Sequence, residues 1–122
     1  MNRMRRFARS FRFAFKGLMT VIKEEQSFRI QLFSAFVVLI LSLAFRISKW
    51  EAVALILVAS SVLVLELINS TLERVVDYMK PRLHHYVEAV KDIMAAAVLV
   101  AAAAAAAVGI IIFWPYLKEL IK

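Results

Sequence analysis

The sequence predicts an all-α integral membrane protein, with an amphipathic interfacial helix at the amino terminus followed by three transmembrane helices. Of its 122 residues, 63% are hydrophobic, which is more apolar surface than a soluble domain of this size could bury. Long apolar runs occupy residues 30–45, 52–68 and 93–114. Only two glycines and two prolines are present, so few helix breaks are expected.

The first element, at residues 1–28, carries too many charges to cross a membrane. Between Met4 and Ile22, apolar residues recur at three- and four-residue steps, while arginines and lysines occupy the other faces. This pattern is typical of a helix that lies in the membrane interface with its basic side chains toward anionic lipid.

Transmembrane helices are expected at about 30–46, 52–72 and 92–114, within a single membrane domain that covers residues 1–122. The RISKWE segment at 46–51 predicts a tight connector that leaves the first two spans antiparallel. A longer connector is expected at 74–91, where Pro81 should break a helix.

The distribution of basic residues predicts the orientation of the chain. The net charge is +7, but the basic residues flank apolar spans, so a membrane explains them better than a nucleic-acid partner does. One side of the membrane would hold twelve basic residues and the other side four (Arg46, Lys49, Lys118 and Lys122). The twelve are Arg3, Arg5, Arg6, Arg9, Arg12, Lys16, Lys23, Arg29, Arg74, Lys80, Arg82 and Lys91. The positive-inside rule then places the amino terminus in the cytoplasm and the carboxyl terminus outside.

A stripe of polar side chains begins inside the second apolar run. Glu66 lies near the end of that run, where a carboxylate in hydrocarbon costs about 2.5–3.5 kcal/mol. Asn69, Glu73 and Asp77 follow at offsets of three, seven and eleven residues, which places all four side chains on one narrow helix face. Three carboxylates on one face repel one another and call for cations, such as Mg²⁺, lysine or arginine.

Two other segments are expected to bring charge to the same level of the membrane. Glu24, Glu25 and Arg29 lie where the first span begins, and Lys91 and Asp92 lie where the third begins. Charge alone predicts a site for a metal ion, a phosphate or a proton, with a structural salt-bridge network as the alternative. The sequence has no cysteine, no phosphate-binding glycine loop and no paired-histidine metal motif.

Four stretches resemble the small prokaryotic diacylglycerol kinase and undecaprenol kinase family: FKGL at 15–18, EEQSFRIQ at 24–31, ELINSTLERVVD at 66–77 and KDIMAAAVL at 91–99. The resemblance covers nearly the whole chain. It implies an ATP-dependent lipid kinase of the bacterial inner membrane, which phosphorylates a lipid hydroxyl at the cytoplasmic face. It also implies a homotrimer whose active sites are each shared between neighbouring protomers.

The resemblance assigns roles to the polar residues. Glu66 would be the catalytic base on the lipid hydroxyl. Glu25 and Glu73 would hold Mg²⁺, the implied cofactor, on the phosphates of ATP.

The remaining residues of the implied site serve the nucleotide. Asn69 would position the metal and phosphate groups, and Lys91 would bind phosphate oxygens. Asp77 and Asp92 match positions tied to the nucleotide end of the site or to its support. Such a set is suited to phosphoryl transfer, which depends mostly on positioning and charge stabilisation.

Undecaprenol and diacylglycerol are both candidate substrates. Residues 93–97 contain neither glycine nor serine, which together with RISKWE favours the undecaprenol kinase branch. Gln31 and the HHYVEAV segment at 84–90 match neither branch.

Two other function classes compete with a kinase. A small oligomeric ion or proton conductor could use Glu66 as a relay. It would need polar residues through the whole membrane depth, but the third span has none and the second adds only Ser60 and Ser61. A membrane-anchored adaptor would use the basic helix but would leave Glu66, Asn69 and Glu73 without a role.

Overall fold

A computed structural model of the chain describes residues 2–79 and 84–122. These residues form four helices: α1 (Arg3–Glu24), α2 (Gln26–Phe45), α3 (Lys49–Met79) and α4 (His84–Ile121). The last three are long and apolar enough to cross a membrane, so the predicted all-α membrane fold is confirmed. Lys80 and Arg82, predicted to lie on the basic side of the membrane, and Pro81, predicted to break a helix, lie outside the described residues.

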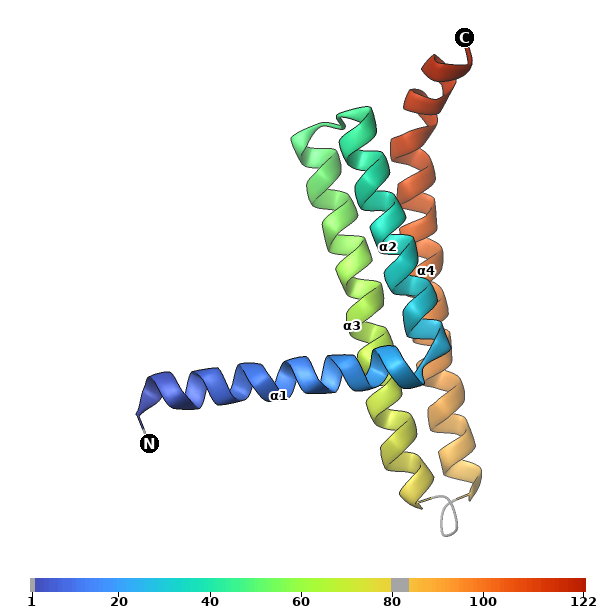
Figure 1. Ribbon diagram of the computed structural model, residues 1–122. Coiled ribbons are helices and arrows are strands. Elements are labelled where there is room, and N and C mark those ends of the chain that lie inside the picture. Colours follow the sequence, from blue (N-terminus) through green and yellow to red (C-terminus); the bar gives the residue numbers. More distant parts are fainter. Residues whose placement is uncertain (1, 80–83) are drawn as a thin grey trace.

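The three long helices lie side by side, and α1 lies across them (Figure 1). α3 packs against both α2 and α4, while α1 packs mainly against α2 and also meets α3 through the ion pair between Glu24 and Arg74. α3 and α4 continue past the level of α1, on the side away from the α2–α3 turn (Figure 1). The bundle therefore has one end that carries the α2–α3 turn and another that carries an α3–α4 hairpin.

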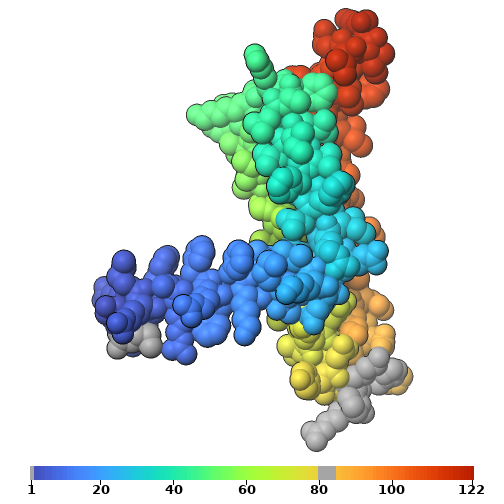
Figure 2. All heavy atoms as spheres, in the orientation of Figure 1, coloured from blue at the N-terminus to red at the C-terminus, as the bar shows by residue number. Residues whose placement is uncertain are grey.

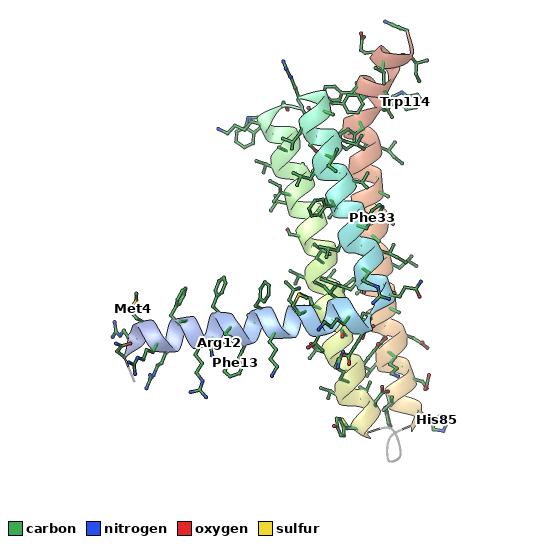
Figure 3. The ribbon with its side chains drawn as sticks, viewed as in Figure 1. Met4, Arg12, Phe13, Phe33, His85 and Trp114 are labelled. Atoms are coloured by element: carbon green, nitrogen blue, oxygen red, sulfur yellow. The ribbon has the colours of Figure 1, made fainter. Side chains whose placement is uncertain are left out.

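α1 extends from the bundle as an arm (Figure 2). The side chain of Asn2 caps its first turn by accepting a hydrogen bond from the backbone N–H of Arg5, at 2.9 Å. None of its residues is buried. Arg12 and Phe13 both extend from the side of α1 that faces away from the α2–α3 turn (Figure 3).

A sharp corner joins α1 to α2. α1 ends because Glu25 has an extended backbone, with φ −111° and ψ 110°. The Arg29 guanidinium, on the first turn of α2, donates hydrogen bonds of 2.9 Å to the carbonyls of Ile22 and Lys23. These bonds satisfy carbonyl groups that the end of a helix would otherwise leave without partners.

The α2–α3 turn is as short as the sequence predicts. Arg46 has a left-handed backbone with φ 52°, which reverses the chain directly after α2. Ser48 and Glu51 then form a capping box, because each side chain accepts a hydrogen bond from the backbone N–H of the other, at 3.3 and 3.0 Å. The Tyr116 hydroxyl donates a 2.5 Å hydrogen bond to Glu51 and so ties the end of α4 to this turn.

The second connector is shorter than the expected segment at 74–91. α3 stays helical to Met79, and α4 is already helical from His84. Val76 and Val87 are 7% and 3% exposed, so the two helices bury side chains on this extension as well. Helix packing therefore continues beyond the apolar runs from which the spans were predicted.

Candidate functional site

The candidate site lies at the corner between α1 and α2, where these helices meet α3 (Figure 3). Glu25 occupies the backbone break itself, between the last residue of α1 and the first of α2. The hydroxyl of Ser70, on α3, donates a 3.1 Å hydrogen bond to Glu25 Oε1. Because Ser70 is only 3% exposed, it fixes the Glu25 carboxylate against the bundle.

Arg74 extends this contact into a network. Its Nη2 atom lies 2.7 Å from Glu24 Oε2 and 3.8 Å from Glu25 Oε1. Its Nε atom donates a 3.4 Å hydrogen bond to Ser70 Oγ. One guanidinium thus joins α3 to both glutamates of the corner.

Glu66 lies one helical turn before Ser70 on α3 and is 7% exposed. The carboxylates of Glu25 and Glu73 are close enough to repel it electrostatically. Burying one carboxylate beside two others is unfavourable for folding, and such arrangements are concentrated at functional sites.

A second cation closes the site on the side of α4. Lys91 Nζ forms a 2.7 Å ion pair with Asp77 Oδ1 across the α3–α4 hairpin. Glu73 is close enough to both Arg74 and Lys91 to attract their positive charges. The stripe on α3 is therefore flanked by Arg74 and Lys91.

The structure brings some of the predicted site residues together and leaves others apart. Glu25 and Glu73 each lie close enough to Glu66 to repel its carboxylate, and Asp77 forms an ion pair with Lys91. Asn69 is half-buried on the same helix. Asp92 is exposed, and within residues 2–79 and 84–122 no hydrogen bond or ion pair joins it to the other candidates. The catalytic and binding roles of all these residues stay predictions.

Sequence reasoning missed Ser70 and the cationic role of Arg74. Both lie on the turns of α3 that follow Glu66, so helical spacing could have marked them as neighbours of the stripe. Arg29, the cation expected at this corner, instead caps backbone carbonyls. The ion pair between Glu24 and Arg74 joins residues 50 positions apart, a separation that local sequence patterns do not reveal.

The donor atoms suit a hard divalent cation. The side chains that converge from the corner and from α3 offer carboxylate and hydroxyl oxygens. Within the described part of the chain, no three carboxylate or histidine side chains form a ready metal cage. Mg²⁺ commonly binds through one or two carboxylates plus substrate phosphates, so this donor set fits a cation that arrives with a phosphate ligand.

Two hollows adjoin the site. One, of about 410 Å³, lies between α1 and α3, with Gly17, Thr71 and Arg74 among its walls. The other, of about 480 Å³, is an apolar groove along α2, α3 and α4 that suits a hydrocarbon chain. Val62, one turn from Glu66 on α3, lines this groove.

Comparison with known proteins identifies the family. Residues 12–113 match the prokaryotic diacylglycerol kinase family. The chain is 32% identical over 116 residues to an undecaprenol kinase of Bacillus subtilis, covering 95% of this chain and 94% of that protein. It is 34% identical over 112 residues to a diacylglycerol kinase of Synechocystis, covering 91% of this chain and 64% of that protein. With its three apolar helices, the chain is therefore a membrane-embedded lipid kinase that belongs to the prokaryotic diacylglycerol kinase family.

Proposed function

We propose that the chain transfers the γ-phosphate of ATP to the hydroxyl of undecaprenol, at the cytoplasmic face of a bacterial inner membrane. The observation that carries this proposal is Glu66, a buried carboxylate one turn from the apolar groove and next to the other carboxylates of the site. A relative named undecaprenol kinase that matches nearly the full length of both chains supports the choice of lipid. Diacylglycerol is the alternative acceptor, after the second relative.

The proposed chemistry begins with the lipid hydroxyl. Glu66 accepts its proton, so that the oxygen can attack the γ-phosphorus of ATP, while the bond from that phosphorus to the β–γ bridging oxygen breaks and ADP leaves. Glu25 and Glu73 would hold Mg²⁺, which would supply neutralisation of the charge on the nucleotide phosphates. The attacking oxygen is delivered from the membrane, because the hydrocarbon chain of the lipid occupies the groove beside Val62.

The other polar residues hold the nucleotide. Lys91 gives up part of its contact with Asp77 to bind phosphate oxygens, since a lysine ammonium serves as a point charge for phosphate. Asn69, which is half-buried, would orient the metal and phosphate groups. Asp77 and Asp92 support the nucleotide end of the site.

The proposal includes an orientation and an assembly. The amino terminus and the α3–α4 hairpin are cytoplasmic, in keeping with the excess of basic residues on these segments. The functional unit is a homotrimer in which neighbouring protomers share each active site.

A phosphorylation assay in mixed micelles tests the function. Purified protein with Mg²⁺ and radiolabelled ATP is given undecaprenol, diacylglycerol or a long-chain alcohol in separate reactions. We expect label in the undecaprenol fraction above all, and loss of the signal with EDTA. No labelled lipid from any acceptor would refute the kinase reaction, and faster labelling of diacylglycerol would reverse the choice of substrate.

A flux assay on the same preparation separates the kinase from a conductor. Liposomes that carry the protein are expected to show no proton or cation flux above that of empty liposomes. Flux without ATP that disappears in a Glu66→Gln variant would favour conduction.

A further inference from the structure

The two glutamates at the α1–α2 corner are held differently. Glu24 takes the direct ion pair with Arg74, at 2.7 Å. Glu25 lies 3.8 Å from the same nitrogen and instead accepts the hydrogen bond from Ser70. Neighbouring residues of the same type thus receive two different kinds of contact from one side of α3.

We propose that Arg74 is a positioning residue for this kinase, acting through Glu24 and Ser70 to hold the Glu25 carboxylate ready for a divalent cation. This inference rests on the proposed metal-binding role of Glu25. It gives tasks to three residues, Glu24, Ser70 and Arg74, that the proposed reaction does not itself use.

The geometry explains how Arg74 can orient Glu25 without neutralising it. Arg74 Nε can only donate, so Ser70 Oγ accepts its hydrogen bond and has its own proton available for Glu25. A direct, close ion pair would place the guanidinium in competition with the metal for the same oxygens. Glu24 removes that competition, because it occupies Nη2 at the shorter distance.

Glu25 needs this restraint because of its position in the chain. Its extended backbone interrupts the helix, so helical geometry does not determine where its side chain points. Ser70 and Arg74, by contrast, lie inside α3, a continuous helix of 31 residues. A rigid element therefore supplies the orientation that the corner lacks. Residues that orient metal ligands in this way typically change metal affinity about 10–100-fold when they are replaced.

Manganese binding tests the proposal without relying on turnover. Electron paramagnetic resonance would follow Mn²⁺ binding to the full-length protein in nanodiscs, with a non-hydrolysable ATP analogue present. We expect Arg74→Gln and Ser70→Ala each to raise the half-saturating Mn²⁺ concentration about tenfold. The double variant should be little worse than either single one, because both break the same chain of contacts. The half-saturating Mn²⁺ concentration of Arg74→Lys should lie between that of the wild type and those of the two single variants. Lysine keeps the charge that pairs with Glu24 but lacks the Nε donor.

Tyr116→Phe is the matched control. It removes a short hydrogen bond to a glutamate at the other end of the bundle, so it can lower stability without touching the corner. Its half-saturating Mn²⁺ concentration should equal that of the wild type. Equal values for Arg74→Gln or Ser70→Ala, with only a lowered unfolding temperature, would overturn the proposal and leave a purely structural contact.

If Arg74→Gln does not fold, Ser70→Ala decides, because it removes only a hydroxyl. Two further outcomes keep this inference separate from the proposed function. If wild-type protein phosphorylates lipid while the Ser70→Ala variant binds Mn²⁺ normally, this inference fails alone. If the metal shifts appear but no lipid alcohol is phosphorylated, the proposed reaction fails while the positioning role stands.

Discussion

Glu66 is a carboxylate that the fold buries beside charges of its own sign. It is 7% exposed, and both Glu25 and Glu73 repel it. No ion pair reaches it within the described part of the chain. A structural role does not account for this placement, because an uncompensated buried charge destabilises a fold. A proton acceptor for a lipid hydroxyl, in contrast, has to lie at the edge of the hydrocarbon.

Replacing Glu66 by glutamine tests that role. The amide has nearly the same shape but cannot accept the proton, so we expect lipid phosphorylation to fall about 10²–10⁴-fold. The fold should be retained, because the change also removes the repulsion from Glu25 and Glu73. Turnover is measured in mixed micelles, and unfolding is followed by circular dichroism in the same detergent. Turnover within a few-fold of the wild type would remove Glu66 as the base.

At the level of single residues, the sequence predicts the stripe but not its cations. Glu66, Glu73 and Asp77 share a face because helical spacing fixes their directions, and that can be read from their numbers. The pairing of Arg74 with Glu24 depends on how α1 turns into α2, which no local pattern encodes. Local sequence also places Arg29 beside the carboxylates. In the structure its guanidinium instead donates hydrogen bonds to backbone carbonyls, because the corner between α1 and α2 brings these within reach.

At the level of elements, apolar runs predict membrane spans better than they predict helix ends. The expected connector at 74–91 is polar enough to leave the membrane, yet most of it is helical. Its helices persist because Val76 and Val87 are buried where α3 and α4 pack together. Hydropathy reports where a chain leaves hydrocarbon, and packing decides where a helix stops.

The amino-terminal half of α1 is exposed along its whole length. The family match begins at residue 12, after Arg3, Arg5, Arg6 and Arg9. Replacing these four arginines by glutamine should weaken the seating of α1 on anionic lipid by about 1 kcal/mol per residue. In a Phe7→Trp background in which Trp50 and Trp114 are replaced by phenylalanine, brominated anionic lipids in the bilayer should quench the single tryptophan less when the arginines are absent.

A matched control tests whether the difference in quenching depends on the charge of the lipid. With brominated zwitterionic lipid only, the arginine and glutamine forms should be quenched alike, because the remaining attraction is apolar. Adding salt should reduce quenching by anionic lipid more in the arginine form than in the glutamine form, which keeps Arg12, Lys16 and Lys23. Equal quenching of both forms by anionic lipid would contradict an electrostatic role for the arm.

At the level of the whole molecule, three helices are long and apolar enough to cross a membrane, and if all three do so the two ends of the chain lie on opposite faces. Because the sequence has no cysteine, single cysteines can report the orientation directly. A membrane-impermeant maleimide should label Lys122→Cys in intact spheroplasts, and should label Asn2→Cys only after lysis. The opposite pattern would place the basic segments outside and reject a cytoplasmic site.

The polar stripe also bears on assembly, because a single chain leaves much of it uncovered. Glu73 and Asn69 are only half-buried, and the Asp77 side chain is 57% exposed. Polar groups at the membrane boundary are more stable when neighbouring helices shield them, and the alanine run at 101–107 permits close helix contact. Self-association is therefore expected, and native mass spectrometry from mild detergent should give the mass of the three 13.9 kDa chains of the proposed homotrimer. A monomer at working concentration would contradict this.

Subunit mixing then distinguishes shared sites from separate ones. Glu66→Gln removes the base on α3, and Lys91→Ala removes the phosphate ligand on α4, so each variant alone should be inactive. If neighbouring protomers contribute α3 and α4 to one site, co-refolding the two variants places an intact α3 beside an intact α4, and lipid phosphorylation reappears. Refolding each variant with itself is the control. If α3 and α4 of one chain together form a complete site, as the Lys91–Asp77 ion pair within one chain would suggest, the mixture stays as inactive as the two single variants. That result would reject the shared site.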